Sequence, residues 1–198
     1  MTLDELIGTL DGSVTEAIYA DQLKNRTIIL NGEIDESVIE KVFVPLFNFD
    51  RDDSKEPVTL IINSVGGSVY DSFAVTDIIE SYHKPLTVIG TGCVLSMALL
   101  LLMAGKNNPN VTRCAFPKTV GLLHAGSMNV SGTQGQVRDI TNFNRHLEEI
   151  VKKFVLQNTT FTEEEYENNY DRELYMSGYQ LLEHGIVDKI LDNKLLDK

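Results

Sequence analysis

The chain has 198 residues and a formal net charge of −12; 42% of its residues are hydrophobic and 23% are charged. This composition is typical of one globular domain with a sizeable core, and it excludes a mainly disordered chain. The large negative charge would repel a phosphate backbone and an anionic membrane surface, which argues against a nucleic-acid-binding or membrane-anchored protein.

The cysteine content and the apolar runs indicate the cellular compartment in which the chain is expected. Cys93 and Cys114 are the only cysteines, and two in this length form no disulfide framework, which predicts a reducing, cytoplasmic location. The first residues carry no basic segment followed by an apolar one, so no signal peptide is expected. The longest apolar run, residues 97–104, is shorter than the roughly 20 residues of a membrane-spanning helix and predicts a buried helix instead.

Five short runs rich in β-branched residues and leucine predict strands. Most are continuously apolar, which is typical of strands buried on both faces of a sheet. The predicted strands cover residues 27–30, 58–62, 86–90, 120–124 and 186–191.

Helical patterns separate these runs. Asp35 is placed to cap an amphipathic segment that reaches residue 47, with a kink or early end expected at Pro45. Further helices are predicted over residues 69–82 and 96–104, and around an apolar stripe between residues 143 and 155. Capping boxes at Thr162-x-x-Glu165 and Ser177-x-x-Gln180 begin two more, and Gly185 ends the second. Strands that alternate with helices predict one α/β domain over residues 1–198.

The carboxyl ends of such strands are the expected place for functional loops. Three segments lie there: residues 63–68, 90–96 and 124–126. Ser96 follows a glycine-containing turn and opens an apolar helix, so it is either a nucleophile or an ordinary N-cap serine. His124 ends an apolar strand, where it is either a general base for Ser96 or a half-buried polar residue.

Two other segments offer supporting chemistry. Gly66 and Gly67 allow a close backbone approach to a ligand, as an arm of an oxyanion hole or simply as a tight turn. Asp171 and Glu173 each offer a carboxylate to orient a histidine, or belong to an exposed charged turn. The other three histidines are predicted to lie at the surface or at helix ends, and the Cys and His spacing predicts no metal site. These three histidines are His83, His146 and His184.

A series of motifs in chain order resembles the ClpP family, the proteolytic subunits of Clp proteases. The resemblance extends from about residue 18 to residue 191, and the order of the motifs makes it specific. The motifs are Arg26-Thr-Ile-Ile-Leu-x-Gly32-x-Ile34-Asp35, Ile-Ile-Asn-Ser-x-Gly66-Gly67-Ser68, Gly92-x-x-x-Ser96-Met97, Leu-Leu-His124, Gly132-x-Gln134-Gly135-Gln136, Asp171-Arg172-Glu173-x-Tyr175-Met176-Ser177 and Glu183-x-Gly185-x-Val187-Asp188.

The resemblance implies a serine endopeptidase that needs no cofactor and no metal. It gives Ser96 the role of nucleophile and His124 that of general base. Glu173 stands where the family has its catalytic Asp, with Asp171 as the next choice for this role. The backbone N–H groups of Gly67 and Met97 correspond to the oxyanion hole.

The resemblance also implies an architecture and partners. The fold is a crotonase/ClpP-like set of repeated ββα units with a protruding handle helix, the handle being about residues 126–160. Subunits form heptameric rings that stack in pairs around a chamber, and a Clp-type ATPase unfoldase feeds unfolded polypeptides into it. Residues 1–17 are a divergent counterpart of the family's axial segment.

Several departures from the family leave other functions open. Besides Glu173, Val65 replaces a proline, and Val94 and Leu95 replace small residues before the serine. A catalytically weak or inactive ring subunit with a structural or regulatory role is the main alternative. An acyl-CoA enzyme of the crotonase type shares the fold but needs no Ser–His pair.

Overall fold

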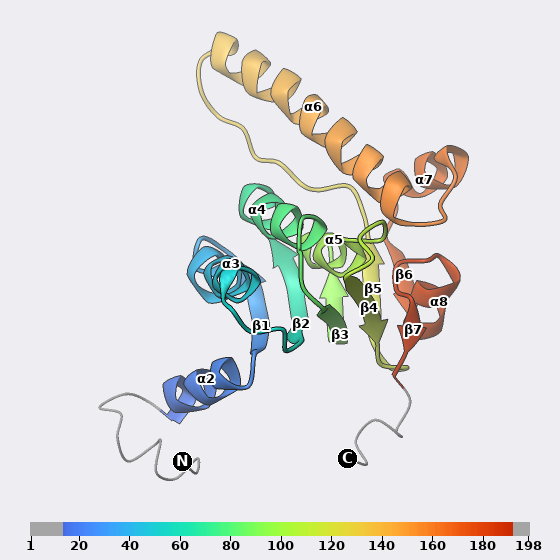
Figure 1. The fold of residues 1–198 in the computed structure, drawn as a ribbon. Coiled ribbons are helices and arrows are strands. Elements are labelled where there is room, and N and C mark those ends of the chain that lie inside the picture. The colour runs from blue at the N-terminus through green and yellow to red at the C-terminus, as the bar shows by residue number, and fades with distance from the viewer. Residues whose placement is uncertain (1–13, 192–198) are drawn as a thin grey trace.

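One seven-stranded sheet organises the molecule. The computed structural model describes residues 14–191 (Figure 1). The strands run in the order β1-β2-β3-β4-β7, with β5 paired to β3 and to β6, and all pairs are parallel except β5 with β6. The strands are β1 (Thr27–Ile34), β2 (Val58–Gly67), β3 (Leu86–Leu95), β4 (Val111–Ala115), β5 (Val120–Leu123), β6 (Leu174–Ser177) and β7 (Lys189–Ile190). The predicted α/β class is confirmed.

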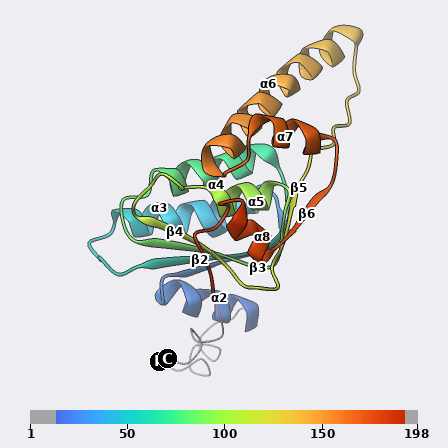
Figure 2. The same ribbon diagram turned by 90° about the vertical axis from the view of Figure 1, so that its right-hand side faces the viewer.

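Helices cover both faces of the sheet. Figure 2 shows α3, α4 and α5 on one face and α2 on the other. All seven residues of α5 are buried, as expected for a helix that is apolar all round. The helices are α2 (Val14–Lys24), η1 (Ile39–Phe43), α3 (Val44–Arg51), α4 (Val69–Glu80), α5 (Met97–Met103), α6 (Gln134–Asn158), α7 (Glu163–Tyr170) and α8 (Gly178–Glu183). Among the helices formed by residues 14–191, none has the length and apolar character to cross a membrane.

The first three strands are longer than predicted. We expected loops over residues 63–68 and 90–96, and this was wrong, because β2 and β3 continue through most of both segments. Pairing of β1 with β2 shifts register after Asn31 and then resumes to join Ile34 to Gly67. The strands therefore carry these segments directly to the candidate site.

Strand β3 changes partner along its length. Residues 86–90 pair with β4, whereas residues 93–95 pair with β5. The sheet forks at this point, and β5 consequently lies beside the end of β3 that leads into Ser96.

Several elements differ from the prediction in extent. Strands β4 and β6 and helix α2 were not predicted, and the strand expected over residues 186–191 contains only Lys189 and Ile190. The divergent segment predicted over residues 1–17 lies mostly outside the described residues, and its last four residues begin α2.

We expected a kink or an early helix end at Pro45; the helix instead changes type just before this residue and continues to Arg51. The π-helix η1 ends at Phe43 and the α-helix α3 begins at Val44. A proline has no N–H to donate to the carbonyl four residues earlier, which is that of Lys41. The hydroxyl of Tyr19 in α2 donates to this carbonyl at 2.7 Å.

Helix α6 extends well beyond the sheet (Figure 1). A capping box of Thr133 and Gln136 begins it, and it includes the predicted stripe between residues 143 and 155. Of its described side chains, only Val155 and Asn158 are buried. The predicted capping box at Thr162 is confirmed at the start of α7. At the start of α8, the amide and hydroxyl of Ser177 both donate to Oε1 of Gln180.

Candidate active site

The fork in the sheet places the serine next to the histidine strand. Leu95, the last residue of β3, pairs with Leu122 in β5. The amide of Ser96 continues this contact by donating to the carbonyl of Leu122 at 2.9 Å. His124 follows β5 by one residue, so Ser96 and His124 emerge from neighbouring strands at the same end of the sheet.

The antiparallel pairing of β5 with β6 brings the acid to the histidine. Leu123 pairs with Leu174, and the next positions outward are His124 and Glu173. Nδ1 of His124 lies 3.2 Å from Oε1 of Glu173. The side chain of His124 is 27% exposed and that of Glu173 is 56% exposed, so the pair lies at the rim of the site.

Ser96 has an unusual backbone conformation. Its φ is 55° and its ψ is −128°, a combination that L-residues rarely adopt and that costs on the order of 1–3 kcal/mol. The serine joins the end of β3 directly to the start of α5, which resembles the strained strand-to-helix turn that presents the nucleophile in serine hydrolases of the α/β-hydrolase fold. Ser96 does occupy the N-cap position of α5, but its side chain makes no capping hydrogen bond, so the hydroxyl is not used as a cap.

The carboxylate of Glu173 is held from two sides. Its Oε1 faces His124, and its Oε2 accepts a hydrogen bond of 2.9 Å from the hydroxyl of Tyr175. The Tyr175 hydroxyl and then the His124 ring lower the pKa of Glu173 below its ordinary value. An ionised carboxylate can only accept, so Nδ1 of His124 must be the donor, and in the neutral imidazole Nε2 then carries the lone pair. This tautomer is the one that a general base for a serine requires.

Glycines bring the end of β2 against the serine turn. A Cβ placed on Gly66 would lie 2.8 Å from the Cβ of Ser96 and 3.0 Å from the amide nitrogen of Met97. A Cβ on Gly67 would lie 2.1 Å from the carbonyl oxygen of Ile34. Both glycines have positive φ and belong to β2, so the tight-turn interpretation is wrong. Met97 is the first residue of α5, where a backbone N–H has no partner within the helix.

A cavity of about 380 Å³ opens over these groups. Gly67, Ser96, Met97 and His124 all line it. Its remaining walls are mainly apolar and come from the end of β2, the start of α4, helices α5, α6 and α7, and residues 123–128. They include Leu100, Leu123, Met128, Leu147, Val151 and Tyr166. The cavity is thus suited to an apolar side chain next to the serine.

Not every predicted contact is present. Within residues 14–191, the Ser96 hydroxyl forms no hydrogen bond, and His124 bonds only to Glu173. Catalytic hydrogen bonds are often loose in ligand-free enzymes and tighten when substrate binds. Asp171 ends α7, is exposed, and has no contact with His124 in the described part of the chain.

The other three histidines lie away from the serine. His83 has an exposed ring bonded to Asp50 at 2.8 Å, His146 is exposed on α6, and His184 ends α8 with its ring stacked on Phe161. Across the described residues, no group of three or more His, Cys, Asp or Glu side chains is arranged to hold a metal ion.

Sequence reasoning missed Tyr175 as a member of the site. It was noted only as part of a motif, because the strand that carries it was not predicted. The available signal was the spacing, since residues two apart on a strand point to the same face.

Comparison with known proteins identifies relatives that match most of the chain. A family model described as Clp protease matches residues 11–194. Two relatives, from Dehalococcoides mccartyi strains BAV1 and CBDB1, carry the name ATP-dependent Clp protease proteolytic subunit. Each is 31% identical to this chain over 177 residues, which are 88% of this chain and 86% of the relative.

These matches agree with the mixed α/β sheet and with the order of motifs along the chain, and the family supports a proteolytic function. The family match covers all of the described residues that form the sheet, its helices and the cavity. The chain therefore belongs to the Clp protease family, and its fold is ClpP-like.

Proposed function

We propose that this chain is a serine endopeptidase that hydrolyses unfolded polypeptides within a ring chamber. The observation that carries the proposal is the shared cavity. Ser96 lies in a strained strand-to-helix turn, and its hydroxyl forms no hydrogen bond with the described residues. It lines the same cavity as His124, which is paired with the carboxylate of Glu173. Family membership supports peptide-bond hydrolysis over an acyl-CoA reaction.

The chemistry follows from the tautomer of His124. Oγ of Ser96 attacks the carbonyl carbon of the peptide while its proton passes to Nε2 of His124. Glu173 stabilises the imidazolium through Nδ1. The C–N bond then breaks as the imidazolium returns the proton to the departing amine, which leaves an acyl ester on Ser96. A water molecule repeats the sequence, releases the carboxylic acid and restores the hydroxyl.

The negative charge that develops on the carbonyl oxygen needs fixed donors. The backbone N–H groups of Gly67 and Met97 are the proposed donors. The close approach of Gly66 to the serine turn, which leaves no room for a Cβ, supports this role because it brings the ends of β2 and α5 together. Donors held by a rigid backbone need no reorganisation during the reaction.

Assembly and partners are part of the proposal. The relatives are named as subunits of an ATP-dependent protease, and we propose that this chain forms stacked heptameric rings fed by a Clp-type ATPase. The apolar side chains exposed on α6, Ile140, Phe143 and Ile150, support a role for this helix as the handle between rings. The free cysteines Cys93 and Cys114 support a cytoplasmic location.

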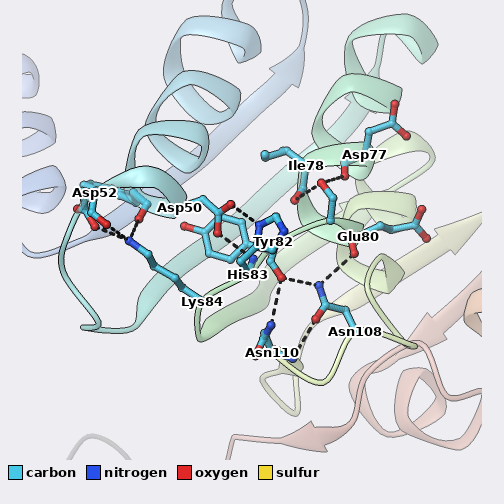
Figure 3. A network of polar contacts seen from close by, with 12 residues as sticks. Asp50, Asp52, Asp77, Ile78, Glu80, Tyr82, His83, Lys84, Asn108 and Asn110 are labelled. Atoms are coloured by element: carbon cyan, nitrogen blue, oxygen red, sulfur yellow. Dashed lines mark hydrogen bonds and ion pairs between the residues drawn. The ribbon is translucent and has the colours of Figure 1, made fainter.

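A fluorogenic peptide assay on the assembled protein tests the catalytic proposal. Ser96→Ala and His124→Ala should each lower kcat by at least about 10³-fold, because the nucleophile and the base act as a unit. His83→Ala is the matched control, because His83 also pairs with a carboxylate, that of Asp50, but does not line the cavity (Figure 3). Equal rates for wild type and Ser96→Ala would remove Ser96 from the mechanism.

A catalytically inactive ring subunit is the second candidate. The missing hydrogen bond between Ser96 and His124 in the described residues favours it. A peptidyl phosphonate that reacts with an activated serine separates the two candidates. Labelling of wild type but not of Ser96→Ala supports the peptidase, whereas no labelling of the assembled wild type supports the inactive subunit.

A further inference from the structure

The hydrogen bond from Tyr175 to Glu173 is not needed to hold β6 in the sheet. Glu173 immediately precedes β6 and Tyr175 is the second residue of the strand, so the two are two positions apart along nearly extended backbone and their side chains lie on the same side. The Tyr175 side chain is mostly solvent-exposed (56%), and its hydroxyl donates to Oε2 of Glu173 at 2.9 Å. Residue 175 is paired through its backbone with Leu122, and this pairing does not involve the hydroxyl.

The position of Glu173 explains why a second contact matters. A glutamate has one more rotatable bond than an aspartate, and more than half of this side chain is exposed to solvent. The single contact with His124, at 3.2 Å, is long for a hydrogen bond to a charged group. A carboxylate held at one oxygen only is less restricted in rotation than one held at both, so a second contact helps to keep it directed at the imidazole.

We propose that Tyr175 is a positioning residue that acts on His124 through Glu173. Its hydroxyl fixes one carboxylate oxygen, so that the other remains directed at Nδ1 of His124. The inference rests on the proposed serine peptidase function, and it adds a fourth residue to the chain of contacts behind Ser96. Tyr175 itself is not expected to touch the substrate, because it does not line the cavity.

The protonation states of Tyr175 and Glu173 are consistent with a hydrogen bond donated by the tyrosine. The hydrogen bond to Glu173 raises the pKa of Tyr175 above its ordinary value, so the hydroxyl stays protonated and remains a donor throughout the neutral range. The same bond lowers the pKa of Glu173 and keeps it an acceptor. The direction of donation is therefore fixed from tyrosine to glutamate.

A double-mutant cycle on the assembled protein tests the proposal. Tyr175→Phe should lower kcat by about 3- to 10-fold, the effect expected for one hydrogen bond, with KM unchanged. In a Glu173→Ala background, the same substitution should change kcat by less than about twofold, because the residue through which Tyr175 acts is gone. Tyr179→Phe is the matched control, because Tyr179 is exposed to a similar extent, 58%, and its hydroxyl has no hydrogen bond to the described residues.

Each other outcome overturns the inference. Equal kcat for wild type and Tyr175→Phe removes the positioning role. A loss that persists in the Glu173→Ala background, or one that appears in KM, makes Tyr175 a substrate contact instead. If the melting temperature of Tyr175→Phe falls far enough to account for the lower kcat, the role of Tyr175 is structural. Ser96→Ala separates this test from that of the proposed function, because only a failure of the function leaves the rate of Ser96→Ala unchanged.

Discussion

A methyl group on Gly66 would lie 2.8 Å from the Cβ of Ser96, closer than any two such atoms lie in folded proteins. The same methyl would lie 2.6 Å from the carbonyl oxygen of Leu95. The end of β2 therefore sets the position of the serine turn, although the two segments are about 30 residues apart in the chain.

Gly66→Ala should consequently impair catalysis by displacing the serine turn. We expect a loss of at least about 10-fold in kcat, since small misplacements of reacting groups are costly. Gly32→Ala is the matched control, because Gly32 has a similar φ of 102° but an open space where its Cβ would lie, whereas Gly66 has a φ of 91°. Peptidase assays and melting temperatures of both variants would be compared, and equal activity would contradict the steric role of Gly66.

The strain at Ser96 predicts a difference in stability between two inactive variants. Ser96→Ala and Ser96→Gly both remove the hydroxyl, but only glycine adopts a φ of 55° freely. The free energy of unfolding of Ser96→Gly should therefore exceed that of Ser96→Ala by about 1 kcal/mol. This difference is the backbone strain that glycine relieves, reduced by the conformational entropy that glycine adds to the unfolded chain. Urea unfolding of the two proteins measures this difference. A more stable Ser96→Ala would show that the turn is not strained.

The choice of orienting acid gives a third prediction. Under the proposed mechanism, Glu173→Ala should lower kcat by about 10²- to 10⁴-fold, as the loss of a triad carboxylate does in well-studied serine proteases. Asp171→Ala should stay within about twofold of wild type, because Asp171 is exposed at the end of α7. Both rates would be measured on particles of the same size, isolated by gel filtration. The reverse pattern would assign the role to Asp171.

Stability in acid should depend on Asp52. Its carboxylate accepts hydrogen bonds from Arg26 and Lys84, which lower its pKa to about 2, and Figure 3 shows the contact with Lys84. The pKa of Asp52 in the folded protein lies below its ordinary value of 3.8. The stability that the ionised Asp52 contributes is therefore present above pH 4 and is lost as the pH falls towards 2.

The melting temperature measured against pH tests this dependence. Asp52→Asn should melt below wild type at neutral pH, and the gap should close between about pH 4 and pH 2. Asp53→Asn is the control, because Asp53 forms no ion pair with the described residues, and it should follow the wild-type curve. A gap that stays constant across this range would contradict the prediction.

The elements that could be predicted from the sequence are those formed by continuous runs of apolar residues. The inner parts of β1, β2 and β3 and the buried helix α5 all have this character, and each was predicted close to its observed position. The extensions of β2 and β3 were missed, because glycine and asparagine interrupt the apolar runs while the backbone pairing continues.

The missed strands depend on contacts distant in sequence. Strand β4 contains Arg113, a residue that argues against a central strand when read locally. In the structure, Arg113 is buried and its guanidinium is bonded to Asp188 and to the carbonyl of Met103. Strand β6 has four residues and only one buried side chain, that of Met176, so no local pattern marks it. Ser96, His124 and Glu173 could be named from the sequence, but the contact of His124 with Glu173 through β5 and β6, and the part played by Tyr175, could not.

The His124–Glu173 pair closes an excursion of 49 positions that contains α6 and α7. The backbone ladder between β5 and β6, rather than the excursion itself, sets the spacing of these two residues. Residues can therefore be added near the tip of the excursion, before Thr133, at little cost in loop entropy and without moving the pair. An insertion confined to this tip would therefore lengthen the outer arm and leave the register of His124 against Glu173 unchanged.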